Sequence, residues 1–253
     1  GTPTLPVTWQ SLGLAQGSFG LFVLITITFY AGELVWRDRD VGVQDIVDAT
    51  RMPTWVGFLA RVGALLLVAL SFEVLIGGAA LIAQVGQGFF DIEWRLYAME
   101  LLVLDFPQTA LICVLALFVQ VAVNQKYLGH FAMVGYYVMQ PVLGYLGVED
   151  RLLRFGSEPG VPYSDMNGYG HFLWPVLWYR LYWWGFAVLL VVVAYLLYVR
   201  GREASWRARR AQVRPRFTRG WRWTVAAGAA AGLGAGAFCF YNTHVLNPFR
   251  TAK

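Results

Sequence analysis

The sequence predicts an all-α integral membrane protein, and two properties of the 253-residue chain predict it. Hydrophobic residues make up 58% of the chain and charged residues only 14%, whereas a typical soluble domain is about a quarter charged. The apolar residues also gather into six stretches, each with roughly the 20 residues that a helix needs to cross the hydrocarbon of a bilayer. We therefore exclude a water-soluble globular fold.

The six predicted spans divide into a bundle and one extra helix. Five of them lie within a helical bundle over residues 12–199, and the sixth, over 221–241, is a separate C-terminal anchor. The fourth span is short and the second is long, so we expect tilting or a broken turn in these two. The predicted bounds are Leu12–Ala31, Val56–Ala83, Ala98–Val123, Gly129–Gly147, Val176–Val199 and Trp221–Tyr241.

The distribution of Lys and Arg predicts the orientation. Of the 20 basic residues, 14 fall in one alternate set of loops, and cytoplasmic loops retain basic residues. Both ends of the chain, residues 1–11 and 242–253, are therefore predicted to lie outside. The Gly- and Pro-rich segment 148–175 is predicted to be an external loop that dips back toward the membrane under cover of neighbouring helices.

The arginine-rich segment 200–220 is predicted to be a cytoplasmic linker. Its arginines alternate with aromatic residues, a composition that by itself is compatible with nucleic-acid binding. Because the segment is tethered between two spans, we interpret it as a loop that fixes topology and binds anionic lipid. Membrane lipid is thus an expected partner, and nucleic acid is not.

A run of mixed charge separates the first two spans, in the stretch "FYAGELVWRDRDVGVQDIVDATRMPTWV". A short helix is expected within it at the membrane surface, with Asp40 as its N-cap and Pro53 preventing its continuation. Val43, Ile46 and Val47 would share one apolar face. The residues leave two interpretations open: a solvated loop that only fixes topology, or a docking element for a cytoplasmic partner.

The same stretch resembles the first cytoplasmic loop of ABC-2 (type V exporter-like) permeases of ABC transporters. The whole chain resembles, more narrowly, the membrane part of bacterial proteins that fuse such a permease to an M1-family aminopeptidase. "YAGELVWRDRD…DIVDATRMPTW" and the ending "FYNTHVLNPFRT" carry this narrower match. The resemblance implies that the loop 33–55 is a coupling element seated on an ABC ATPase subunit, with candidate contacts at Glu33, Arg37, Asp38, Arg39, Val43, Asp45, Ile46, Val47 and Asp48.

The resemblance also has consequences for the rest of the assembly. It implies the bacterial inner membrane and a second permease unit, either another copy or a homologous half. An ABC-2 unit has both ends in the cytoplasm, so the family's first span is expected upstream of Gly1, in keeping with a start that lacks Met. An external peptidase domain is expected after Lys253.

Nucleotide and metal motifs are absent from the sequence. It contains no G-x-x-x-x-G-K-S/T phosphate loop and no H-E-x-x-H zinc motif. ATP is therefore expected on a partner subunit and zinc on a downstream domain, and the chain itself has no predicted cofactor or catalytic residue. Cys113 and Cys239 lie in apolar stretches and are expected to be core residues rather than disulfide or metal ligands.

Three acidic residues fall within predicted spans, namely Glu73, Glu100 and Asp105. Ionisable groups at this depth are costly and face a cavity or a partner. They are expected either to line a translocation path or coupling site, or to form interhelical pairs. Glu100 and Asp105, five residues apart, are not expected to share a helix face, and a broken turn at Pro107 would leave Asp105 near the outer interface.

The last span places three glycines at four-residue spacing: Gly228, Gly232 and Gly236. Such a stripe allows close helix contact in lipid. Its partner is either another span of the chain or another subunit, and an anchor without a particular partner is the alternative.

Three classes of function follow from these observations. The favoured one is the permease subunit of an ABC-2-like exporter. The second is a membrane anchor or scaffold that holds a peptidase or a complex without transporting anything. The third is a secondary transporter or membrane enzyme unrelated to ABC systems, with Glu73 as its ion site.

Overall fold

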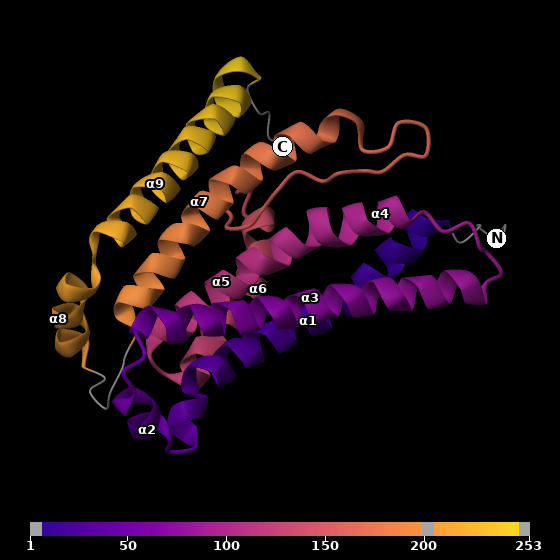
Figure 1. Ribbon diagram of the computed structural model, residues 1–253. Helices are drawn as coiled ribbons and strands as arrows, with labels where there is room; N and C mark the ends of the chain where they lie inside the picture. The colour runs from indigo at the N-terminus through magenta and orange to yellow at the C-terminus, as the bar shows by residue number, and fades with distance from the viewer. Residues whose placement is uncertain (1–6, 199–204, 248–253) are drawn as a thin grey trace.

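The computed structural model of the protein describes residues 7–198 and 205–247, and most of these residues are helical (Figure 1). Within the described residues there is no β-strand, only an isolated bridge between Ser164 and Gly168. The elements are α1 Thr8–Asp40, α2 Gln44–Ala49, α3 Thr54–Gly86, α4 Trp94–Ala98, the π-helix η1 Met99–Asp105, α5 Phe106–Val123, α6 Lys126–Tyr145, the 3₁₀ turn η2 Gly170–Phe172, α7 Leu173–Leu197, α8 Trp206–Arg216, α9 Arg219–Phe240 and the π-helix η3 Tyr241–Leu246.

Five helical segments are long and apolar enough to cross a membrane, which agrees with the predicted all-α membrane class. They match the first, second, third, fifth and sixth predicted spans. The predicted fourth span lies on α6, which has 20 residues but is not among the five. The five segments are Thr8–Asp40, Thr54–Gly86, Trp94–Val123, Gly170–Leu197 and Arg219–Leu246.

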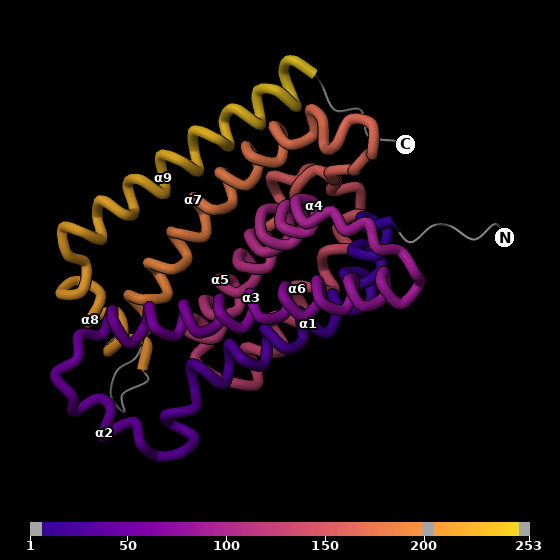
Figure 2. The backbone as a smooth tube through the Cα atoms, turned by 45° about the vertical axis from the view of Figure 1, so that its right-hand side comes forward, coloured from indigo at the N-terminus to yellow at the C-terminus, as the bar shows by residue number. Residues whose placement is uncertain are grey.

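The helices form a bundle with two distinct ends. Helix α1 packs against α3 and α5, α6 packs against α5 and α1, and α7 packs between α5 and α9. Figures 1 and 2 show α2 and α8 near one end of the bundle, hereafter the α2 end. The opposite end, where the segment 148–172 leads into α7, is hereafter the loop end.

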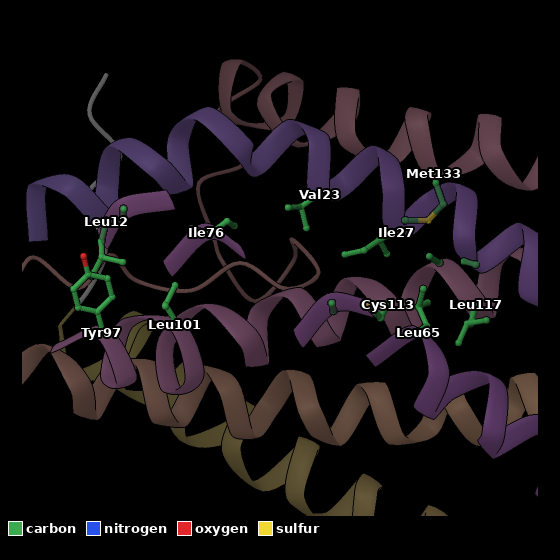
Figure 3. Packing of buried hydrophobic residues seen from close by; sticks show 14 residues of the cluster. Leu12, Val23, Ile27, Leu65, Ile76, Tyr97, Leu101, Cys113, Leu117 and Met133 are labelled. Carbon is green, nitrogen blue, oxygen red and sulfur yellow. The ribbon is translucent and has the colours of Figure 1, made fainter. Parts of the chain in front are cut away.

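The main hydrophobic core joins six elements of the bundle, namely α1, α3, α4, η1, α5 and α6. Ile27 of α1, Leu65 of α3 and Met133 of α6 are each completely buried in it, and Tyr97 and Leu101 extend it toward the loop end (Figure 3). Burial of such side chains is worth about 1.5–3 kcal/mol each in water. In lipid the packing itself supplies the attraction, so this core fixes how α1, α3, α5 and α6 sit together.

The charged run after the first span is helical, contrary to the prediction of a loop beginning at residue 33. Helix α1 continues through Asp40, which is its last residue and not the N-cap of α2. Gly42 has a φ of +72°, the left-handed conformation with which glycine commonly ends a helix. Only residues 41–43 and 50–53 of the predicted loop 33–55 are non-helical, and α3 starts directly after Pro53 as expected.

The helix is not broken at Pro107, again contrary to the prediction. Residues 94–123 form one helical run in which η1 is a π-helical segment, and Pro107 occupies the first turn of α5. Proline has no N–H, so the carbonyl of Val103 loses its α-helical donor. A donor from elsewhere in the bundle replaces it, and Asp105 lies within an unbroken helical run.

The long loop folds back into the bundle between α5, α6 and α7. Gly156 is buried, and side chains donate to three consecutive backbone carbonyls: Tyr136 to Phe155 (2.8 Å), Gln108 to Gly156, and Trp183 to Ser157 (3.0 Å). Backbone carbonyls that are buried in the bundle require donors of this kind. Sequence predicted such a re-entrant segment over 148–175; in the structure it ends where η2 begins, at Gly170.

The arginine-rich linker contains a helix, α8, and residues 199–204 lie outside the described residues. Ser205 caps α8 by accepting from the N–H of Ala208 (3.3 Å). Arg209 is buried and donates to the terminal carbonyls of two helices, those of Val121 and Ala122 on α5 and of Leu197 on α7. The last carbonyls of a helix lack intrahelical donors, so Arg209 caps both helices at once.

Candidate functional site

The charged residues of the predicted docking region tie three helices together at the α2 end. Asp38 forms an ion pair with Arg61 of α3. Lys126, the first residue of α6, lies 2.6 Å from Glu33 and 2.8 Å from Asp40. Arg39 places its guanidinium over the ring of Trp36 (4.8 Å). Asp38, Glu33 and Arg39 therefore contribute to internal contacts.

A second group of the predicted residues faces outward. Ile46 exposes 72% of its surface and Val43 exposes 38%, while Arg37 and Asp45 are also exposed. The predicted apolar face of α2 is therefore split, because Val47 points inward instead. At a protein surface this group offers two aliphatic side chains flanked by one charge of each sign.

Val47 and Asp48 line a small pocket at the α2 end, of about 40 Å³. Arg61 of α3, Tyr198 after α7 and Arg209 of α8 share this pocket. Burial lowers the pKa of Arg209, and the nearby Arg39 lowers it further. The structure thus brings the α2 loop and the arginine-rich α8 together, which the sequence did not predict.

Glu73 and Asp105 line one cavity of the bundle, which is open on one side. The cavity has a volume of about 230 Å³ and lies between α1, α3 and the junction of η1 with α5. Thr109 donates to Oε1 of Glu73 (3.1 Å), and Gln16 of α1 donates to Asp105. Sequence placed both residues within spans but expected only Glu73 at depth.

The cavity lining is mixed, with carboxylates, amides and aliphatic groups. Among its lining residues there is no Lys, Arg or His. The complete lining, within the described part of the chain, is Gln16, Gly20, Val23, Leu24, Glu73, Ile76, Asp105, Gln108 and Thr109.

Glu100, the third predicted intramembrane acid, has a separate partner. The hydroxyl of Tyr169, at the end of the long loop, donates to its carboxylate (2.9 Å). Burial, together with this hydrogen bond, raises the pKa of Tyr169. Both residues lie on the π-helical segment η1, and their carboxylates have separate partners, Tyr169 for Glu100 and Gln16 for Asp105. That they occupy different helix faces stays a prediction.

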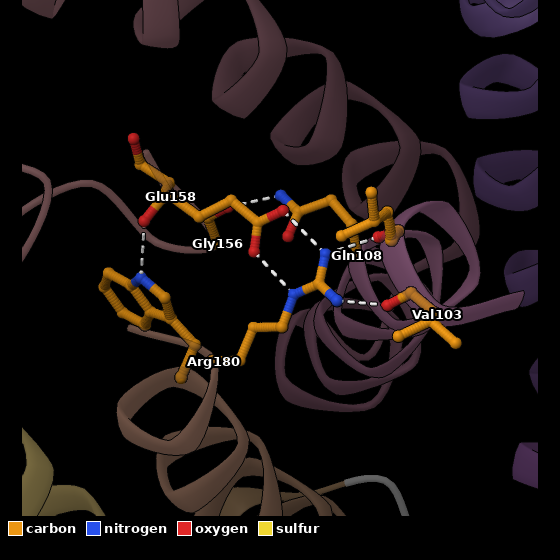
Figure 4. A network of polar contacts seen from close by, with 8 residues as sticks. Val103, Gln108, Gly156, Glu158 and Arg180 are labelled. Carbon is orange, nitrogen blue, oxygen red and sulfur yellow. Dashed lines mark hydrogen bonds and ion pairs between the residues drawn. The ribbon is translucent and has the colours of Figure 1, made fainter. Parts of the chain in front are cut away.

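A buried arginine that sequence analysis missed organises the region beside the cavity (Figure 4). Arg180 of α7 binds both carboxylate oxygens of Glu158 (2.7 and 2.8 Å) and donates to the carbonyls of Val103 and Leu104. The Val103 carbonyl is the one that Pro107 leaves without its α-helical donor. The sequence did contain a signal for this contact: an arginine lies inside one apolar span, and a proline that leaves a carbonyl without its donor lies inside another.

The glycine stripe of α9 packs against α7 of the same chain. Its closest approach is to Gly185, a residue that the sequence analysis did not single out. A Cβ on Gly185 would lie 2.5 Å from the backbone nitrogen of Gly232 and 2.7 Å from the carbonyl oxygen of Gly228. Gly236 lies against the ring of Tyr182, where a Cβ would approach to 2.9 Å.

No protein-family model, curated protein or solved structure matches this chain. The structure also offers no metal site, since no group of three or more His, Cys, Asp or Glu side chains in residues 7–198 and 205–247 could hold an ion.

Proposed function

We propose that this chain is the permease part of an ABC-2-like transporter, driven by a separate ABC ATPase that docks on α2. One observation carries the proposal. A short helix with outward-facing aliphatic side chains connects the same ends of two 33-residue helices, α1 and α3. A partner that pushes on α2 therefore pushes on both of these helices.

The ion pairs at the α2 end support a mechanical coupling. Asp38–Arg61 joins α1 to α3, and Lys126 joins α1 to α6 through Glu33 and Asp40. A displacement of α2 is thereby passed to three helices together. In this proposal ATP binds to the partner, and its effect on the bundle is limited to the difference in its affinity for two conformations.

The proposal includes the expected surroundings of the chain. A transporter of this class has two permease units, so a second unit is part of it. The six-span arrangement counts α6 as a span, with α2 and α8 facing the cytoplasm of a bacterium and the long loop facing outward. A zinc peptidase domain would follow on the outer side.

The test is a pull-down of the native protein from its own membranes, with bound ATPases identified by mass spectrometry. We expect an ABC ATPase with the native chain and at least a tenfold loss with Ile46→Asp, since a central apolar anchor of an interface is worth about 2 kcal/mol or more. Arg37→Ala should weaken binding less. Substitution of Asp38 or Arg39 is avoided, because each has an internal partner.

Met166→Asp is the matched control, because Met166 is 99% exposed and lies in the long loop at the opposite end. It should retain the ATPase fully. An ATPase retained equally by Ile46→Asp would refute docking on α2. The absence of any ATPase from the native preparation would refute the transporter and favour the membrane anchor.

A further inference from the structure

We propose that the cavity between α1, α3 and α5 binds a protonated amine carried on a compact apolar body. This inference concerns binding by the chain alone and needs no ATPase. It can therefore stand or fall independently of the docking proposed above.

One residue that lines the cavity carries an unsatisfied acceptor. Glu73 exposes only 3% of its surface, and its Oε2 has no hydrogen-bond partner among the described residues. The one hydroxyl beside it, that of Thr109, already donates to the other carboxylate oxygen, Oε1. A buried carboxylate oxygen without a donor is costly, and a ligand with an N–H group would remove that cost.

Gln108, another lining residue of the cavity, carries a second acceptor without a partner. Oε1 of Gln108 is buried and also has no partner in the described part of the chain. Its amide cannot simply be turned around, because Nε2 donates to the carbonyl of Gly156 in the re-entrant loop. One acceptor on α3 and one on α5 therefore lack hydrogen-bond donors. A protonated amine carries several N–H donors and no acceptor, so it suits both.

The charge of the cavity favours a cation over a neutral donor. Asp105 adds a second carboxylate to the lining, and it receives a hydrogen bond only from the neutral amide of Gln16. The nearest guanidinium along α7, that of Arg180, binds Glu158 and two backbone carbonyls. Arg180 acts electrostatically on Asp105, but neither Asp105 nor Glu73 forms an ion pair with a described residue, so a cation that enters the cavity would supply that partner.

The size and the remaining walls indicate the body of the ligand. A cavity of about 150 Å³ accommodates benzene, so about 230 Å³ suits a small organic molecule better than a bare ion. Gly20, Val23 and Leu24 of α1 and Ile76 of α3 supply aliphatic walls. The lining therefore matches an ammonium group attached to a compact hydrocarbon.

The test measures binding of amantadine, a primary ammonium on a hydrocarbon cage, to the purified chain in nanodiscs. The neutral analogue adamantan-1-ol is the ligand control. We expect saturable binding of amantadine and at least tenfold weaker binding of the alcohol, in line with the larger contribution of hydrogen bonds to charged groups. Equal binding of both compounds would overturn the inference.

Protein variants locate the site. Glu73→Gln and Asp105→Asn keep the shape of the side chains and should each weaken amantadine binding about tenfold or more. Glu93→Gln, which removes an exposed carboxylate at the loop end, should bind like the native chain. Unchanged affinity in both cavity variants would overturn the inference.

A blocking variant covers the case in which a carboxylate variant misfolds. Gly20→Leu would project into the cavity, while a Cβ on Gly20 meets no atom within 4 Å. Gly17→Leu, three residues earlier on α1 and equally free of contacts, is its matched control. Loss of amantadine binding with Gly20→Leu alone supports the site, and loss with neither variant refutes it.

Discussion

At the scale of single residues, buried polar groups hold this apolar bundle in one arrangement. Arg180 is the clearest case, since its side chain connects the re-entrant loop to the carbonyls beside the π-helical segment. Arg209 connects two helices at the α2 end, where its guanidinium donates to the last carbonyls of α5 and α7. In lipid, such contacts add specificity that apolar packing alone lacks.

Arg180→Met should therefore destabilise the protein strongly. It leaves the Glu158 carboxylate without its counter-ion and the Val103 carbonyl without a donor, and removal of one partner of a buried ion pair costs about 3–5 kcal/mol. The measurement is equilibrium unfolding in mixed micelles. Adding Glu158→Gln to Arg180→Met should restore part of the loss, because the unpaired charge is then gone.

Arg151→Met is the control for this prediction, because Arg151 is exposed in the loop. Its effect should stay within about 0.5 kcal/mol, as for most surface substitutions. Equal unfolding free energies for the Arg180 and Arg151 variants would contradict a structural role for the Arg180 network.

At the scale of elements, the approach of α9 to α7 depends on the absence of a side chain at one position of α7. Gly185 faces the backbone of both Gly228 and Gly232, so the two helices meet backbone to backbone. The stripe on α9 was visible in the sequence, but its partner was not. The sequence left two possible partners for the stripe, another span of the chain or another subunit. In the structure the partner is α7, a span of the same chain.

Gly185→Ala should lower the free energy of unfolding by about 1–3 kcal/mol, the usual cost of overpacking a well-packed contact. The added methyl group meets backbone atoms, which cannot rotate away. Gly234→Ala, on the partner helix α9, is the control, since nothing lies within 4 Å of a Cβ there. Thermal unfolding in detergent compares them.

The two variants should change the melting temperature in opposite directions, or only Gly185→Ala should change it. In a helix, alanine is favoured over glycine by about 1 kcal/mol, so Gly234→Ala should leave the melting temperature unchanged or raise it. A melting temperature for Gly185→Ala at or above the native value would show that α7 and α9 do not meet at this residue.

At the scale of the whole molecule, the two ends of the bundle differ in construction. The α2 end carries the short helices α2 and α8 with most of the described arginines, and the loop end carries the long segment 148–172 that folds back into the bundle. This asymmetry predicts opposite faces of a membrane for the two ends. The number of spans, five or six, depends on whether α6 crosses the membrane.

Cysteine labelling from the two sides of the membrane tests this topology. Ile46→Cys and Gln125→Cys should react with an impermeant maleimide only from the cytoplasmic side, and Leu146→Cys and Met166→Cys only from the other. All four native side chains are exposed. Cys113 and Cys239 are buried and can be replaced by alanine to remove background.

Each pair of cysteine positions answers a separate question. Labelling of positions 46 and 166 from the same side would contradict the opposite placement of the two ends. Labelling of positions 125 and 146 from the same side would show that α6 does not cross, and the six-span proposal would fall.

The sequence by itself determined the class of protein and the order of its elements. Apolar stretches of sufficient length identified every described helix that is long and apolar enough to cross a membrane, and α2 ends before Pro53, as predicted. These signals are local, because a helix satisfies its own backbone hydrogen bonds in lipid. The π-helical segment η1, in contrast, was not predicted from the sequence.

Only the tertiary structure decided which residues meet. Gln16 reaches Asp105 across 89 positions of the sequence, Arg180 reaches Val103 across 77, and Gly185 meets the stripe on α9. In a soluble helix the apolar face marks the side that packs, whereas in lipid both the packed and the lipid-facing sides are apolar. The sequence pattern therefore identifies the spans, and the cavity of Glu73 and Asp105 exists only once those spans have packed.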